Sequence, residues 1–138
     1  MTLGPVSGVV LAAGPSRRFG RHPPKQLARL GGRVLVRRIA EEAIASKLCQ
    51  VVVVVGFAAE RVEQALAELP VVIVRNPDYA TGQSSSVRVG LEAVDRAAAA
   101  AMFLPVDQPC LTADVIDALL DQRQRTGAAI VVPSHAGH

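Results

Sequence analysis

The sequence predicts an α/β protein of three layers, in which a mostly parallel sheet lies between two layers of helices. Apolar segments of strand length alternate with segments of helical periodicity along all 138 residues, which indicates successive strand–helix–strand units. Residues 51–55 are five consecutive valines, a run typical of a strand buried on both faces. Aromatic residues make up only 3% of the chain, so we expect a single domain over residues 1–138 with a core of Val, Leu, Ile and Ala.

Five strands are expected, each an apolar run that a glycine, a proline or polar residues bring to an end. They span residues 6–12, 51–55, 71–74, 102–106 and 128–132. Four helices are expected where apolar residues recur every three or four positions. They span residues 34–46, 59–68, 84–97 and 112–125. Between the first strand and the first helix, Pro23-Pro24 excludes a helix and Gly31-Gly32 predicts a turn.

The helix ends and the helix faces follow from the same spacing. Ser84 or Ser85 is expected to cap the third helix and Thr112 the fourth, because their side chains can accept hydrogen bonds from amides of the first turn. The positions expected to face the core are Leu35, Ile39 and Ala43 in the first helix, Val87, Leu91 and Val94 in the third, and Val115, Ile116, Leu119 and Leu120 in the fourth. Cys49 and Cys110 have neither metal nor disulfide spacing, and their apolar neighbours predict small buried thiols.

The charge distribution favours a small anionic ligand over a polymer. The chain has a formal net charge of +3 and a pI of about 9.4, and many of its basic residues lie between Arg17 and Arg38. They form no stripe with interleaved aromatic residues, so nucleic-acid binding is not expected. No apolar run reaches the roughly 18 residues of a membrane span, and the N-terminus lacks a signal-peptide pattern. We therefore expect a cytoplasmic protein without a membrane segment.

The first candidate site follows the first strand, where open α/β sheets usually bind their ligands. Ala12, Ala13 and Gly14 have small side chains, so their backbone can approach a ligand and their amides can bind phosphate oxygens. Arg18 and Lys25 add positive charge suited to a triphosphate. The glycine is not followed by Gly-Lys-Ser/Thr, so this loop is not a P-loop. The alternative is a strand that ends in a tight turn beside surface basic residues.

The second candidate feature is the segment from Thr81 to Gly90, in which a glycine leads into three serines at the expected start of the third helix. A helix N-terminus has free amides and a partial positive charge. The three successive serines add hydroxyls that could contact a base or a ribose. The alternative is a helix cap followed by serines that face solvent.

The third candidate site is Asp107, which stands at the end of the expected fourth strand. A carboxylate at this position suits Mg²⁺, which prefers hard oxygen ligands and usually keeps phosphate oxygens and waters. The alternative is an aspartate that caps the turn leading to Pro109.

These three features, in this order, resemble the MobA-like nucleotidyltransferase family, and in particular its molybdenum cofactor cytidylyltransferases. The matching motifs are LAAGPSRRFG at 11–20 with KQL at 25–27, NPDYATGQSSS at 76–86, and DQP at 107–109. The resemblance runs from the first strand to the end of the chain. It implies a Rossmann-like nucleotidyltransferase fold of the nucleotide-diphospho-sugar transferase type. It also implies transfer of CMP from CTP to the terminal phosphate of molybdopterin, with release of pyrophosphate.

The resemblance implies a role for each matching residue. Catalysis falls to Arg18, Lys25 and Asp107, of which the two basic residues hold the triphosphate and Asp107 binds Mg²⁺. The implied nucleotide-binding set is Leu11, Ala12, Ala13, Gly14, Arg18, Lys25, Gly82, Gln83, Ser84 and Ser85, the last four near the base and ribose. The implied partners are CTP, a molybdopterin-type phosphate acceptor, and a molybdoenzyme or its chaperone.

Three other interpretations stay open. Pro24-Lys25-Gln26 also resembles sugar- or polyol-phosphate cytidylyltransferases, although these carry Arg-Pro after the strand-end aspartate, where this chain has Asp107-Gln108-Pro109. A guanylyl-transferring relative usually has glycine where Ala13 stands. Finally, the family continues beyond the position of His138, so the domain is expected to lack its C-terminal part and could be a nucleotide-binding module without turnover.

Overall fold

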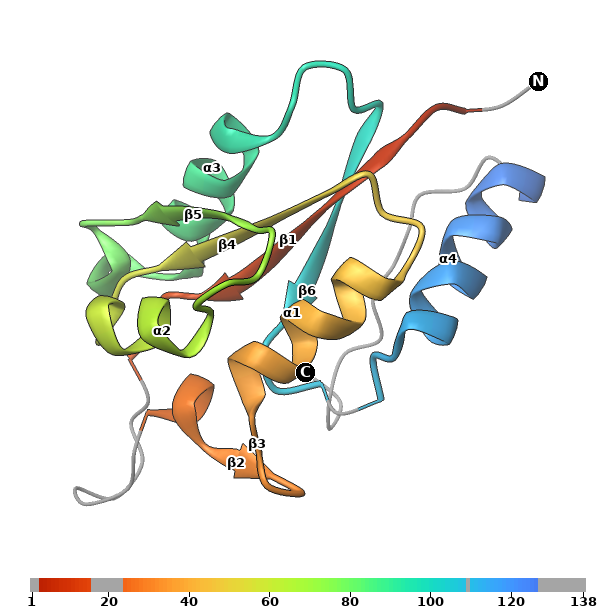
Figure 1. Cartoon of the computed structure of the whole chain (residues 1–138). Coiled ribbons are helices and arrows are strands. Elements are labelled where there is room, and N and C mark those ends of the chain that lie inside the picture. Colours follow the sequence, from red (N-terminus) through yellow and green to blue (C-terminus); the bar gives the residue numbers. More distant parts are fainter. Residues whose placement is uncertain (1–2, 16–23, 109, 127–138) are drawn as a thin grey trace.

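The structure is a computed structural model, and residues 3–15, 24–108 and 110–126 of the chain are described. Within them, the main sheet contains β1 (Val6–Ala12), β4 (Gln50–Val55), β5 (Val72–Arg75) and β6 (Ala100–Pro105), and a hairpin contains β2 (Arg29–Leu30) and β3 (Arg33–Val34). The helices are α1 (Leu35–Ala45), α2 (Ala59–Ala65), α3 (Gln83–Ala93) and α4 (Ala113–Thr126), with 3₁₀ turns η1 (Lys25–Leu27) and η2 (Tyr79–Thr81). Figure 1 shows the main sheet running between the helices.

The main sheet is parallel throughout the described residues, with the strand order β5-β4-β1-β6. β1 lies inside the sheet, where Val10 pairs with Val53 on one side and with Leu104 on the other. The predicted parallel α/β architecture is therefore confirmed, and β1 has the predicted bounds. The predicted turn at Gly31-Gly32 joins β2 to β3, a hairpin that was not predicted. The strand predicted at 128–132 lies outside the described residues.

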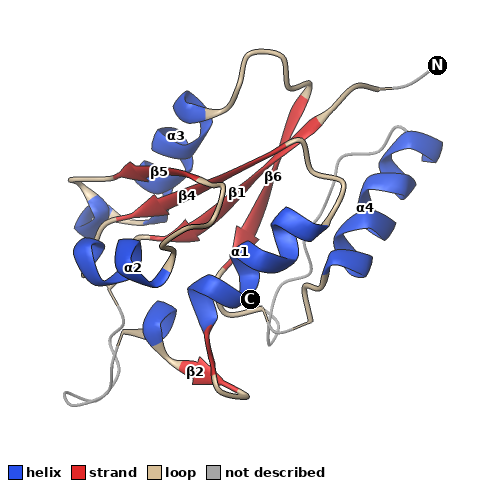
Figure 2. Ribbon diagram, viewed as in Figure 1, coloured by secondary structure: helices blue, strands red, loops and turns tan. Residues whose placement is uncertain are grey.

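Helices cover both faces of the sheet, as Figure 2 shows. Successive residues of a strand point to opposite faces, so the run of valines in β4 supplies both layers of the core. On one face the core joins β1 and β4 to α1, α2 and α4 through residues that include Val10, Val53, Ile39, Val62 and Ile116. On the other face, Val9, Val52 and Val54 pack against α3 through Val89 and Ala93. The predicted three layers are thus present.

α3 packs closely on the sheet because Gly90 faces it. A Cβ at Gly90 would lie 2.6 Å from Val9 Cγ1 and 3.1 Å from Val54 Cγ2. The prediction that Leu91 faces the core is wrong, because Leu91 is 48% exposed and the buried residues of α3 are Ser86 and Gly90. Small residues face the sheet here, so the helix can approach it more closely than a leucine would allow.

α4 begins as predicted, but one of its predicted core positions is wrong. The Thr112 hydroxyl accepts a hydrogen bond from the Val115 amide at 3.3 Å and so caps the helix. Ile116 is fully buried, and Leu119 and Leu120 pack partly against the core. Val115 is instead 36% exposed, since its neighbour Ile116 occupies the centre of the buried face.

The two cysteines are exposed, so the prediction of buried thiols is wrong. Cys49 immediately precedes β4 and Cys110 lies between β6 and α4, and in such connections apolar neighbours do not imply burial. Within the described ranges, no helix combines the length and the apolar character needed to cross a bilayer.

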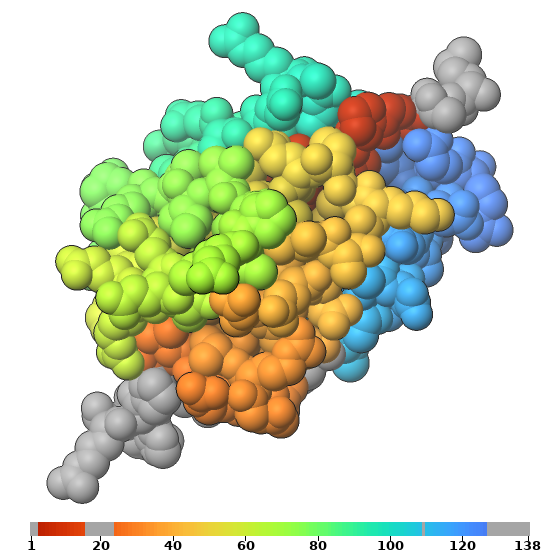
Figure 3. All heavy atoms as spheres, viewed as in Figure 1, coloured from red at the N-terminus to blue at the C-terminus, as the bar shows by residue number. Residues whose placement is uncertain are grey.

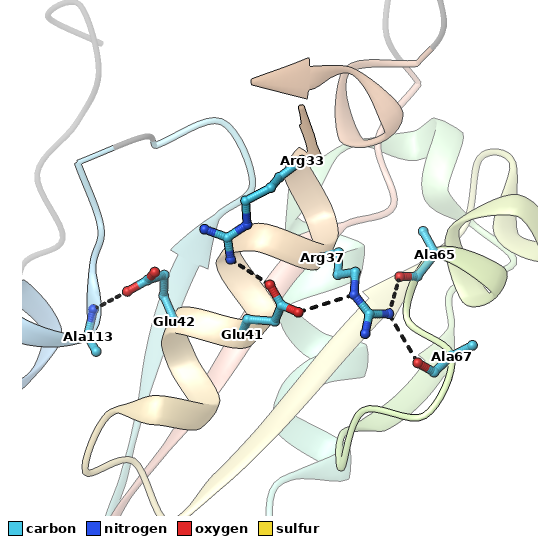
Figure 4. Close-up of polar contacts among 7 residues, drawn as sticks. All are labelled: Arg33, Arg37, Glu41, Glu42, Ala65, Ala67 and Ala113. Carbon is cyan, nitrogen blue, oxygen red and sulfur yellow. Dashed lines mark hydrogen bonds and ion pairs between the residues drawn. The ribbon is translucent and has the colours of Figure 1, made fainter. Parts of the chain in front are cut away.

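α1 is tied to both of its neighbouring helices by polar side chains (Figure 4). The Arg37 guanidinium donates to the carbonyl oxygens of Ala65 and Ala67, each at 3.1 Å, where α2 ends. Carbonyls at a helix C-terminus lack partners within the helix, so Arg37 satisfies that of Ala65 and also binds the Ala67 carbonyl in the turn that follows α2. At the other end, the Ala113 amide donates to Glu42 Oε1 at 2.7 Å and joins the start of α4 to α1. The surfaces of α1 and α2 adjoin in the space-filling view (Figure 3).

Candidate functional site

A cavity of about 610 Å³ opens at the carboxyl ends of β1 and β6. From β1 the chain passes to β4 and then β5 on one side of the sheet. After β5 it crosses to β6, which lies on the other side of β1. The strand order therefore reverses between β1 and β6, which is where open parallel sheets form ligand clefts. The predicted site residues that line the cavity are Leu11, Ala12, Ala13, Gly14, Lys25, Gly82, Gln83 and Asp107. The three candidate motifs, which lie far apart in the sequence, thus meet at one cavity.

Lys25 and Asp107 form the charged part of this cavity. η1 presents Lys25, Asp107 follows β6, and Lys25 Nζ donates to Asp107 Oδ2 at 3.1 Å. The two side chains are 40% and 34% exposed, so a ligand that enters the cavity can reach both. Adjacent opposite charges suit a ligand that itself carries both signs, such as a complex of a divalent cation with a phosphate.

Gln26 holds the loop that follows β1, a role that was not predicted from the sequence. Its side chain is 2% exposed, and Nε2 donates to the carbonyl oxygens of Ala12 at 3.1 Å, Gly14 at 3.2 Å and Phe57 at 3.5 Å. Buried polar side chains are held by such partners. The sequence signal was slight, because a single glutamine in a loop has no periodicity to indicate its direction.

The approach to α3 is organised by Asn76, which is 1% exposed. Its Nδ2 donates to Ser85 Oγ and to Ser86 Oγ, both at 2.9 Å, and its Oδ1 accepts from the Asp78 amide at 2.9 Å. Ser86 is 5% exposed and lines the cavity. The motif at 76–86 therefore contributes a buried hydroxyl to the site, at a position next to the predicted ones.

Ser84 and Ser85, both predicted site residues, do not line the cavity in the described part of the chain. The Ser85 hydroxyl lies within hydrogen-bond distance of the Gly82 carbonyl oxygen at 2.8 Å and of the Asp78 carbonyl oxygen at 3.1 Å, either of which can accept its one hydrogen, and Ser84 is exposed. The prediction that one of them caps α3 is wrong. The N-cap is Gly82, whose φ of 123° is a conformation that residues with side chains rarely adopt. The glycine turns the chain into the helix before the serines begin.

Tyr79 supplies an apolar wall that the sequence analysis did not predict. Its ring packs edge-on against Phe57 with 6.1 Å between the ring centroids and an angle of 66°. A Cβ at Gly56 would lie 2.7 Å from Tyr79 Cβ, so a glycine at the end of β4 makes room for the ring. The other lining residues outside the implied nucleotide-binding and catalytic sets are Pro15, Gln26, Ala80, Ser86, Pro105 and Val106.

The donor set at Asp107 fits a divalent ion that is bound together with a phosphate ligand. Among the described residues, no group of three or more His, Cys, Asp or Glu side chains could hold a metal ion. Asp107 supplies one carboxylate, and Mg²⁺ usually takes one or two carboxylates and completes its shell with phosphate oxygens and waters. Arg18, the remaining residue predicted to act in catalysis, lies outside the described residues.

The similar solved structures are nucleotidyltransferases of the nucleotide-diphospho-sugar transferase fold, and the chain shares this fold. A homologue of Rv0371c from Mycobacterium sp. strain JC1 is 36% identical with a TM-score of 0.75, covering 86% of this chain and 59% of that one. Rv0371c from Mycobacterium tuberculosis, solved in complex with manganese, is 26% identical with a TM-score of 0.72, covering 88% and 60%. Residues 8–138 match the MobA-like NTP transferase domain, and the chain belongs to this family.

Characterised relatives are longer than this chain and carry different names. The bifunctional protein GlmU of Carboxydothermus hydrogenoformans is 28% identical over 127 residues, which are 92% of this chain and 28% of GlmU. Nicotine blue oxidoreductase of Paenarthrobacter nicotinovorans is 36% identical over 115 residues, which are 83% of this chain and 55% of that protein. The chain thus spans between about a quarter and just over half of these relatives' length. Their names describe different chemistries.

Proposed function

We propose that this protein transfers a nucleotidyl group from a nucleoside triphosphate to a phosphate-bearing acceptor. The observation that carries the proposal is the meeting of Lys25 and Asp107, 3.1 Å apart, at a cavity whose wall includes the backbone of Ala12, Ala13 and Gly14. Lys25 offers positive charge to phosphate oxygens, and the small residues let a triphosphate approach backbone amides. Membership of the MobA-like NTP transferase family supports the same reaction class.

The proposed reaction needs little proton transfer, because the acceptor phosphate is already a nucleophile. One of its oxygens forms a bond to the α-phosphorus. The bond between that phosphorus and the oxygen bridging to the β-phosphate breaks, and its electron pair leaves with pyrophosphate. The protein must therefore position two anions and offset their charge. Lys25 is suited to this task, and Arg18 is the second basic residue that we propose for it.

We propose Asp107 as the protein ligand of Mg²⁺. The bound ion would neutralise charge on the triphosphate. Asp107 holds its carboxylate at the cavity and accepts from Lys25 there, so a metal–triphosphate complex could take the place of that contact. The manganese complex of Rv0371c supports divalent-metal binding in a related protein.

CTP is the proposed donor and a molybdopterin-type phosphate the proposed acceptor, with a molybdoenzyme or its chaperone as a further partner in the cytoplasm. The motif at 25–27 and Ala13 support CTP, because guanylyl-transferring relatives usually have glycine at the position of Ala13. Ser86 adds a physical reason for base contact. Its buried hydroxyl accepts from Asn76 at 2.9 Å and lines the cavity, so its own hydrogen is available to a carbonyl of the base.

The test is release of pyrophosphate when the purified protein is mixed with Mg²⁺, molybdopterin and one nucleoside triphosphate at a time. We expect release with CTP, and a loss of roughly 100-fold or more in Lys25→Ala and in Asp107→Asn, because each removes charge stabilisation at the reacting phosphates. Glu63→Gln is the matched control, since Glu63 also pairs with a basic residue, Arg75, at 2.7 Å, but does not line the cavity. Its activity should equal that of the unmodified protein.

Each other outcome points to a different function. Release with GTP and not with CTP would overturn the base assignment, and greater thermal stabilisation by GTP would do the same. A sugar or polyol phosphate that outperforms molybdopterin would replace the proposed acceptor. Nucleotide binding without pyrophosphate release in the presence of any of the acceptors would show a binding module in place of an enzyme.

A further inference from the structure

The carbonyl groups of the loop after β1 are engaged by the protein itself. Gln26 Nε2 donates to the Ala12 oxygen at 3.1 Å and to the Gly14 oxygen at 3.2 Å. Between them, the Ala13 oxygen accepts from the Phe57 amide at 2.9 Å. Three successive carbonyl oxygens are therefore occupied, whereas neither the Ala13 amide nor the Gly14 amide donates to another described residue.

This pattern decides which polar groups of the loop remain for a ligand. Carbonyl oxygens carry partial negative charge and repel phosphate, whereas amides attract it. The Ala12 carbonyl and the Ala13 amide share one planar trans peptide and point in opposite directions. Holding the carbonyl against Gln26 therefore sets the direction of the amide, and the bond from Phe57 does the same for the Gly14 amide. The loop is arranged to receive an anion.

Gln26 also belongs to the turn that carries Lys25. In η1, the Leu27 amide donates to the Pro24 oxygen at 2.9 Å and the Ala28 amide donates to the Lys25 oxygen at 3.1 Å. The buried Gln26 side chain anchors this turn to the loop after β1, while Lys25 reaches Asp107 from the same turn. One side chain thus joins the amides of the loop to the cation of the site.

We propose that Gln26 is a positioning residue for the reaction, which holds the Ala13 and Gly14 amides and the Lys25 turn ready for a triphosphate. The inference rests on the proposed function. Gln26 acts through the loop and does not itself bind the phosphates. A loop already held in its bound conformation avoids the entropic cost of ordering when the ligand arrives.

The first test measures CTP affinity by titration calorimetry in the presence of Mg²⁺, well below the melting temperature. Gln26→Met keeps the length of the side chain and removes its donors, and we expect it to weaken binding about tenfold, because the loop must then become ordered when the nucleotide binds. In the activity assay, the variant should have a higher KM for the nucleotide and an unchanged KM for the acceptor. Equal CTP affinity in the variant and the unmodified protein would overturn the proposal.

Gln50→Met is the matched control. Gln50 also serves the structure through its amide oxygen, which accepts from Ser7 Oγ at 2.9 Å and from the Asp95 amide at 3.0 Å. It stands at the amino end of β4, away from the cavity. This variant should lose stability and keep its CTP affinity. A comparable loss of affinity in both variants would mean that general destabilisation, and not positioning, explains the effect.

The second test needs no nucleotide. Hydrogen exchange of the Phe57 amide reports on its bond to the Ala13 oxygen, and we expect Gln26→Met to speed this exchange about tenfold relative to Val53 in the core. Unchanged exchange at Phe57 would overturn the positioning role. Faster exchange in the variant, together with no nucleotide binding by the unmodified protein, would support the loop-fixing role and overturn the proposed function instead.

Discussion

Ser85 and Ser86 are adjacent in the sequence but face different surroundings. The Ser85 hydroxyl, in the first turn of α3, accepts from Asn76 and faces the carbonyl oxygens of Asp78 and Gly82, which precede its position in the chain. The Ser86 hydroxyl is buried and lines the cavity, and it accepts from Asn76. Consecutive residues on a helix differ in direction by about 100°, so neighbouring serines are not equivalent.

Ser86→Ala should therefore weaken CTP binding, whereas Ser84→Ala should not. We expect a loss of about five- to tenfold for Ser86→Ala, as for one hydrogen bond to a ligand, and a change within about twofold for the exposed Ser84. Asn76 keeps Ser85 as a partner in the Ser86 variant, so the fold should persist. Titration calorimetry measures both affinities, and an equal loss in the two variants would contradict the assignment.

The site residues predicted from the sequence are those whose charge contrasts with the residues around them. Lys25 is a basic residue close to a small-residue loop, and Asp107 is an acid at the end of an apolar run, so both stand out locally. Gln26 does not, because its importance lies in which carbonyl oxygens it reaches once the chain has folded. Arg18 stays a prediction.

At the level of single elements, the packing of α3 on the sheet depends on a glycine, Gly90, which has no side chain. Gly90→Ala should destabilise the protein by about 1–3 kcal/mol, because the new methyl group would overlap Val9 in a packed core. Leu91→Ala should cost about 1 kcal/mol or less, well below the about 2–5 kcal/mol of a buried leucine, because Leu91 is 48% exposed. Urea unfolding measures both. A larger loss in Leu91→Ala than in Gly90→Ala would restore the face predicted from the sequence.

Glu41, on α1, makes the stability of the fold depend on pH. The hydrogen bond from Arg33 lowers the pKa of Glu41 below its ordinary value, Arg37 adds to this, and partial burial opposes it. Because the folded-state pKa is the lower one, the ionised carboxylate stabilises the fold above the ordinary glutamate pKa of about 4.3. This stabilisation is lost as the pH falls through the folded-state pKa.

Glu41→Gln should remove this contribution. We expect a loss of only about 0.5 kcal/mol at pH 7, because Glu41 and Arg37 are 35% and 39% exposed and water screens the pair. As the pH falls through the folded-state pKa of Glu41, the variant and the unmodified protein should approach each other in stability, because the carboxylate becomes protonated. Urea unfolding over a series of falling pH values gives the comparison, and a difference that stays the same throughout the series would contradict the assignment.

The elements themselves were largely predictable, and their faces less so. The valines of β4 and the bounds of β1 follow from apolar runs, and Thr112 caps α4 for the reason expected. The inward face of α3 was missed because periodicity assumes that large apolar residues face the core. Close packing on the sheet favours Gly90 over Leu91, and that preference appears only when the partner surface is known.

For the whole molecule, the sequence predicted the layers but not the order of the strands. Alternating strands and helices indicate a parallel sheet, yet the sequence of an apolar run does not indicate which strands it pairs with. The order β5-β4-β1-β6 decides that the ends of β1 and β6 lie side by side. The cavity, and with it the meeting of residues from three distant motifs, follows from this order.

The ion pair of Lys25 and Asp107 has a consequence for how the site fills. Each residue serves as the counter-ion of the other while the cavity holds no ligand. A divalent cation alone would leave the Lys25 ammonium beside a second positive charge, and a triphosphate alone would leave the Asp107 carboxylate beside further negative charge. We therefore expect the proposed complex of a cation with a triphosphate, which would supply both counter-ions at once, to bind in preference to either of its parts.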